Sequence, residues 1–114
     1  MKEQILFIGL LFQSRDMMHL AHLKTTSYAT HKALNEYYDG ILDLTDSFVE
    51  KYFGINGRQE LTIPESSAMD PKKHLIALRA EMEKVRDTFT TDLQNIIDEM
   101  LGLVNETLYL LTLG

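Results

Sequence analysis

The two prolines of the 114-residue chain, Pro64 and Pro71, lie close together, and no other proline interrupts the sequence. Because proline breaks the interior of a helix, long helices are possible on both sides of this segment. Apolar residues recur at three- and four-residue steps on both sides, which is the period of an α-helix that buries one face. The sequence therefore predicts an all-α chain that is divided by one long connection.

Four helices are expected from this periodicity and from the residues that cap helix ends. The first two cover about residues 3–24 and 28–53, and a short turn joins them. The third begins at Asp70-Pro71, an N-cap followed by the residue favoured at the first helical position. The fourth begins with the capping-box sequence TDLQ at residues 91–94. One continuous helix in place of the third and fourth is the alternative.

The long connection covers residues 54–69, GINGRQELTIPESSAM, and Gly54 is expected to end the second helix. Short turns on either side of one long link suggest two helical hairpins that pack as an antiparallel four-helix bundle. With 45% hydrophobic residues, a chain of this length can bury one core. We therefore expect a single domain that spans residues 1–114.

Charge and composition exclude several classes of function. The net charge is −6 and neither end carries a basic tail, so nucleic-acid binding, which needs clustered positive charge, is not expected. Cysteine is absent, which rules out disulfides and thiolate metal sites. The apolar run at residues 5–12 is too short to span a bilayer and lacks the features of a signal peptide. We expect a cytoplasmic protein without a membrane partner.

Histidines and acids are concentrated in the first two expected helices. Three of the four histidines, His19, His22 and His31, precede a ladder of five acids on the second helix: Glu36, Asp39, Asp43, Asp46 and Glu50. At about 100° per residue, the acids form a stripe beside the apolar side, and His31 lies on the border. The simplest interpretation is a solvated helix face beside a hydrogen-bonded histidine. The alternative is a metal site, because imidazole and carboxylate together suit iron, zinc or manganese.

The spacing of His19, His31, Asp46 and Glu50 resembles the ferroxidase motif of the Dps-type miniferritins, which belong to the ferritin-like superfamily. The stretch HKALNEYYDGILDLTDSFVEKY, residues 31–52, is similar to that family's second helix without a gap. The resemblance implies a ferritin-like bundle that binds iron(II), oxidises it with peroxide or dioxygen, and stores the ferric product. It implies no catalytic residues apart from the metal ligands and no organic cofactor.

In that family the iron site lies across a two-fold subunit interface, and helix geometry fits such a site here. His31 and Glu50 are separated by about 28 Å along one helix, at a rise of about 1.5 Å per residue. One chain cannot bring both to one ion, but two antiparallel chains can. His19 and His31 would then come from one chain, and Asp46 and Glu50 from the other. The resemblance thus implies at least a homodimer, and the family's assembly is a dodecamer.

Several positions depart from that family's pattern. Asn35 stands where an aspartate is usual, so it is only a second-tier ligand. His22 is the other second-tier ligand, and otherwise we expect it to be solvated. Leu20 replaces a tryptophan, the link at residues 54–69 is short, and His74 is expected to have no role in the site. Two alternatives follow: a catalytically inactive structural or interaction protein of the same fold, or a bundle that binds zinc or manganese without redox chemistry.

Overall fold

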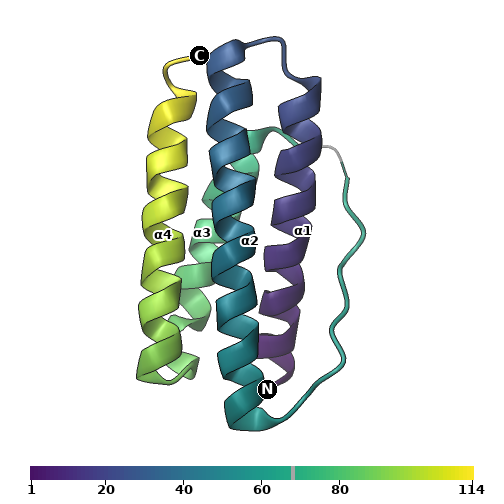
Figure 1. Ribbon diagram of the computed structural model, residues 1–114, viewed down its shortest axis with the longest axis vertical. Helices are drawn as coiled ribbons and strands as arrows, with labels where there is room; N and C mark the ends of the chain where they lie inside the picture. Colours follow the sequence, from purple (N-terminus) through teal and green to yellow (C-terminus); the bar gives the residue numbers. More distant parts are fainter. Residues whose placement is uncertain (68) are drawn as a thin grey trace.

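The computed structural model describes residues 1–67 and 69–114, and Ala68, in the expected link, lies outside the described residues. The described residues form an all-helical bundle without strands, which confirms the expected all-α class (Figure 1). The elements are α1 (Lys2–Lys24), α2 (Tyr28–Asn56), α3 (Pro71–Val85), the 3₁₀ turn η1 (Arg86–Thr88) and α4 (Thr91–Leu111). None of these described helices combines the length and the apolar character that crossing a membrane requires.

Each helix of the bundle has two antiparallel neighbours. α1 packs against α2 and α3, and α4 packs against the same two helices. α2 and α3 therefore lie on a diagonal and run in the same direction, so the chain must return along the bundle between them (Figure 1). The described part of that return, residues 57–67 and 69–70, is called the crossover below. The expected arrangement of two hairpins joined by one long link is confirmed.

The helix ends agree with the sequence at most positions. Ser27 caps α2 by accepting a hydrogen bond from the backbone N–H of Thr30 at 3.2 Å, and Asp70 caps α3 in the same way. The prediction that Gly54 ends the second helix is wrong, because α2 continues through it. The helix ends before Gly57, whose φ of 80° is a conformation that glycine adopts without strain.

The break between the third and fourth helices is confirmed, since η1 separates them and α3 ends at Val85. The capping box expected at residues 91–94 is wrong. The N-cap of α4 is Thr90, one residue earlier, and its side chain makes no cap hydrogen bond. The Thr90 hydroxyl instead donates to the carboxylate of Asp92 at 2.6 Å. It therefore accepts no hydrogen bond from the first backbone N–H groups of α4.

The crossover runs alongside α1 (Figure 1). Gln13 donates to the carbonyl oxygen of Glu65 at 2.9 Å, and at 3.4 Å to that of Pro64. The carbonyl of Thr62 approaches Gly9 so closely that a Cβ on residue 9 would lie nearer than 3.0 Å to its oxygen. The absence of a side chain at Gly9 therefore allows the crossover to reach the helix backbone.

Candidate functional site

The structure brings the three N-terminal histidines together and leaves the predicted carboxylate ligands elsewhere. His19 and His22 lie in the last turns of α1, and His31 lies in the first turns of α2. The short turn between these antiparallel helices places their side chains in contact. Asp46 and Glu50 lie further along α2, at least about 22 Å from His31 along the helix axis. One chain therefore supplies nitrogen donors at one end and oxygen donors towards the other.

His22 and His31 form a reciprocal pair across the α1–α2 turn. Nδ1 of His22 lies 2.6 Å from the carbonyl oxygen of His31, and Nδ1 of His31 lies 2.8 Å from the carbonyl oxygen of His22. The two rings stack with centroids 3.7 Å apart. Because a carbonyl oxygen only accepts, both Nδ1 atoms must carry the hydrogen. In a neutral ring this leaves Nε2 with its lone pair, the arrangement in which histidine binds a metal.

His22 is only 7% exposed, so the expectation that it is a solvated surface residue is wrong. Its ring is covered on one side by His31 and contacts the edge of Tyr38, with centroids 5.3 Å apart. The sequence could not reveal this burial, because it depends on the two helices meeting at a particular register. The role of His22 visible in the structure is to fix His31 through its backbone carbonyl and its ring.

Tyr38 is the centre of the polar cluster beside this pair. The ring of His19 stacks on Tyr38 with centroids 4.2 Å apart, and the guanidinium of Arg15 lies 5.3 Å from the Tyr38 ring centre. The Tyr38 hydroxyl donates to Oδ1 of Asn35 at 2.7 Å. The Asn35 amide in turn reaches the carboxylate of Asp39 at 3.5 Å. Asn35 thus anchors Tyr38, and its oxygen, considered above as a second-tier ligand, already accepts a hydrogen bond.

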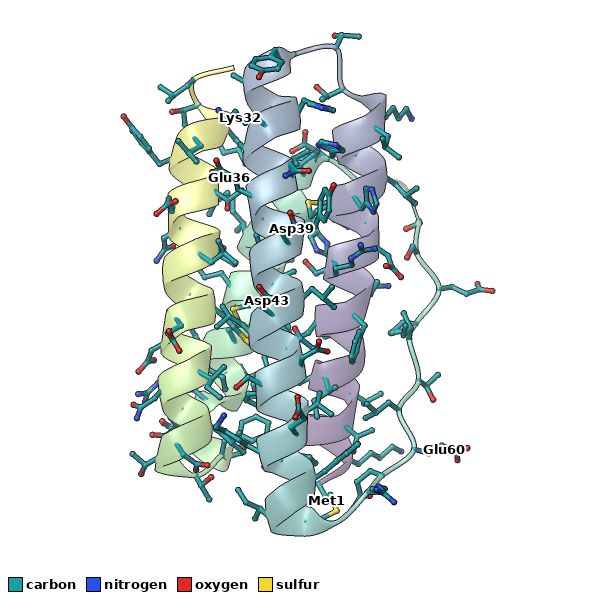
Figure 2. All side chains as sticks on the ribbon, viewed as in Figure 1. Met1, Lys32, Glu36, Asp39, Asp43 and Glu60 are labelled. Atoms are coloured by element: carbon teal, nitrogen blue, oxygen red, sulfur yellow. The ribbon has the colours of Figure 1, made fainter. Side chains whose placement is uncertain are left out.

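The acid ladder, defined as Glu36, Asp39, Asp43, Asp46 and Glu50, lies on the exposed side of α2. Figure 2 shows its first three members in succession along this helix, below Lys32. The ion pairs among the described residues all involve Arg15 or Arg86, so no ladder carboxylate is in an ion pair there. Lys51 on the same helix donates instead to Ser47 at 2.8 Å. The ladder is therefore a solvated stripe of carboxylates that make no ion pair within the described residues.

No group of three or more metal-binding side chains forms within the part of one chain that the structure describes. The histidine end provides imidazole nitrogen and the ladder provides carboxylate oxygen, and together these are the donors that iron(II), zinc and manganese accept. The chemistry of the donor set fits such a metal, but the donors of one chain are too far apart to bind it together.

A buried polar network in the middle of the bundle was missed by the sequence analysis. The hydroxyl of Ser14 lies 2.7 Å from the Tyr37 hydroxyl and 2.8 Å from Nε2 of His74, which joins α1, α2 and α3. Burial raises the pKa of the Tyr37 phenol, although its hydrogen bond with Ser14 opposes this, and burial lowers the pKa of His74. The available signal was Ser14 itself, a polar residue between the core positions Leu11 and Met18 of one helix stripe.

A family model described as a family of unknown function, DUF5856, matches residues 22–111 of the chain. The chain belongs to the DUF5856 family. Its sequence is also 32% identical over 110 residues to an uncharacterized 14.6 kDa protein in the mobD-ri intergenic region of Enterobacteria phage T4. That similarity covers 94% of this chain and 86% of the phage protein. No solved structure matches the chain.

The identification as a Dps-type miniferritin is therefore wrong. The family that matches is DUF5856, and neither the family model nor the T4 relative is described as ferritin-like or Dps-type. The resemblance depended on a few positions in two helices, and steps of three and four residues recur on any helix with one polar stripe. Of the predicted ligands, His31, Asp46 and Glu50 lie inside the DUF5856 match, and His19 precedes it.

Proposed function

We propose that this DUF5856 protein binds divalent metal ions, with iron(II) as the first candidate, at sites shared by two copies of the chain. Each site takes His19 and His31 from one copy and Asp46 and Glu50 from the other. The observation that carries the proposal is the orientation of His31, whose Nδ1 donates to the carbonyl of His22. A histidine held in this way presents Nε2, and such outer hydrogen bonds orient metal-binding histidines in general.

The carboxylate half of the site has the properties that a cation needs. Asp46 and Glu50 lie one turn apart on the exposed side of α2, and no ion pair in the described chain involves either of them. A stripe of like charges also raises the local concentration of counter-ions. Two free carboxylates at this spacing can therefore contribute oxygen ligands to one ion without first losing another partner.

The need for a second copy follows from the separation along α2. A two-fold axis that crosses α2 near residue 40 places His31 of one copy opposite Asp46 and Glu50 of the other. Because the axis acts on both copies, the dimer holds two equivalent sites. Iron(II) is the substrate in this proposal: the two ions of a dimer would give one electron each to one peroxide, which takes up two protons and leaves as two waters, whereas one dioxygen would need four iron(II) ions and four protons.

We propose further that the bundle is of the ferritin-like type. Support comes from its connectivity, in which one long crossover joins the parallel diagonal helices α2 and α3, as in that class of bundle. This proposal concerns the fold and does not depend on the metal. The cytoplasmic location expected from the sequence stays a prediction.

Isothermal titration calorimetry, in which iron(II) is added to the metal-free protein under anaerobic conditions, tests the proposed site. Wild type is expected to bind about one ion per chain. His31→Gln and Glu50→Gln should each weaken binding by about 10-fold or more, because each removes one donor. Glu106→Gln removes an equal charge from an exposed position on α4 and is the matched control. Adding peroxide to the loaded protein then tests oxidation through ferric absorbance. Equal binding by wild type and both site variants would overturn the assignment.

A second candidate function is that of a structural or interaction protein without catalysis. The observation that favours it is Asn35, which offers a neutral amide oxygen that is already bonded to Tyr38. A well-folded oligomer that leaves iron(II) unoxidised would support this alternative. A protein that binds zinc or manganese without redox chemistry would be recognised by the metal that copurifies with it.

A further inference from the structure

The acid ladder has a consequence for how two copies can meet. α2 carries five carboxylates against two lysines, Lys32 and Lys51, so its charge is strongly negative. All five carboxylates are exposed, and none is in an ion pair within the described residues. Any partner that approaches this side of α2 must therefore approach unneutralised negative charge.

The shared site dictates which charges face one another. With the axis near residue 40, the middle of one ladder faces the middle of the other, so that Asp39 and Asp43 of the two copies meet. Towards the two ends, the histidines of one copy face Asp46 and Glu50 of the other, whereas Arg15, which lies over Tyr38 and pairs with Asp16, stays near the centre. Nitrogen and oxygen donors thus meet at the ends only when the copies run antiparallel, whereas the centre brings carboxylate against carboxylate.

The same face offers little apolar surface to offset this repulsion. Leu42, Val49 and Phe53 border this face and are partly covered within their own chain, and the strongly exposed aromatic side chain on it, Tyr28, lies at the N-terminal end of α2, away from the centre. Stable protein interfaces usually bury a cluster of well-packed apolar or aromatic side chains at their centre. Here the centre would contain acids, so burial of apolar surface is a weak driving force for association.

The geometry points to a divalent cation as the switch for subunit association, an inference that rests on the shared metal site proposed above. Without metal, ladder repulsion keeps the chain monomeric at low ionic strength. Cations bound between the histidines of one copy and the carboxylates of the other neutralise part of each ladder, and they join the two copies through α2. The partner is a second copy of this chain, bound antiparallel.

Sedimentation velocity tests the switch, because it measures the mass of the particle and does not depend on iron oxidation. The metal-free protein should sediment as a 13.1 kDa monomer in about 20 mM salt, and manganese(II) should convert it to a dimer. Raising the salt to about 500 mM without metal should strengthen self-association, because ions screen the ladder at that concentration.

Asp39→Asn combined with Asp43→Asn tests the electrostatic step separately, since neither residue is a proposed ligand. The double variant should associate at least 10-fold more tightly than wild type without metal. The matched control, Glu99→Gln with Glu106→Gln, removes the same charge from exposed positions of α4 and should leave association unchanged. This control separates a local effect of the ladder from an effect of net charge.

Calorimetry on the same samples distinguishes the possible failures. A metal-free dimer at low salt would overturn the switch, and the proposed function would survive if iron(II) still bound. A mass that neither manganese(II) nor the double variant changes, despite measured metal binding, would overturn the switch as well. If neither metal binds, the proposed function fails and the switch fails with it.

Discussion

Replacing Gly9 with alanine tests how firmly the crossover is held against α1. In an exposed helix interior, this change stabilises a protein by about 0.5–1 kcal/mol, because glycine loses more backbone freedom on folding. At Gly9 the new Cβ would come closer than 3.0 Å to the carbonyl oxygen of Thr62. That atom belongs to the backbone, so the crossover itself must move away from the helix.

The cost follows from what this movement breaks. The hydrogen bonds from Gln13 to Glu65 at 2.9 Å and to Pro64 at 3.4 Å would be lost or weakened, at about 0.5–1.5 kcal/mol each. Leu61, which packs against the core, would lose part of its burial, at roughly 1 kcal/mol. After the gain from alanine is subtracted, Gly9→Ala should lower the free energy of unfolding by about 1–3 kcal/mol.

Urea unfolding followed by circular dichroism measures this difference, and the chain supplies its own controls. Gly54 and Gly102 lie within helices, and a Cβ on either would meet nothing within 4 Å. Gly54→Ala and Gly102→Ala should therefore raise the free energy of unfolding by up to about 1 kcal/mol. If Gly9→Ala proved as stabilising as these controls, the crossover would not be packed on α1 as described, and the reasoning would fail.

The buried network leads to the remaining predictions. Ser14→Ala leaves the Tyr37 hydroxyl and Nε2 of His74 without their shared partner. It should therefore lower the free energy of unfolding, measured in urea, by about 2–4 kcal/mol. Tyr37→Phe keeps the hydrogen bond between Ser14 and His74, so it should cost less. Equal losses in the two variants would contradict this account. Burial lowers the pKa of His74 from its ordinary 6.5, so the unfolded chain takes up a proton more readily than the folded one. The stability that the neutral His74 side chain contributes is fully present above pH 6.5 and is lost as the pH falls through the lower pKa of His74 in the folded chain. His74→Gln should reduce the slope of unfolding free energy below pH 6.5, and an unchanged slope would refute this contribution.

The helices and their pairing could be predicted from the sequence because the necessary signals are local. Apolar periodicity located each helix, and the single long link fixed two hairpins. The end of α2 was placed wrongly because both Gly54 and Gly57 can follow a helix, and only the backbone shows which one has a positive φ. Local signals thus recover the elements, and they leave the last turn ambiguous when two candidate glycines stand close together.

Less of the candidate site could be predicted, because its parts meet through tertiary contacts. The burial of His22 depends on the register between α1 and α2, and the link between Ser14 and His74 joins residues 60 positions apart. The Asp46 and Glu50 half of the proposed site is further removed, since in the proposal it requires a second chain. The spacing of these residues led to the wrong family, and the ligands that it predicts stay a proposal.

The reciprocal pair of His22 and His31 also bears on the order in which the chain can become organised. Their hydrogen bonds join residues nine positions apart, whereas the bond from Ser14 to His74 must close a loop of 60. The entropy lost on closing a loop rises with its length, so the first hairpin is the cheaper contact to form. The two rings can therefore meet while α3 and α4 are still unfolded. The nitrogen donors of the proposed site can then be positioned by the first third of the polypeptide alone, before the crossover packs on the bundle.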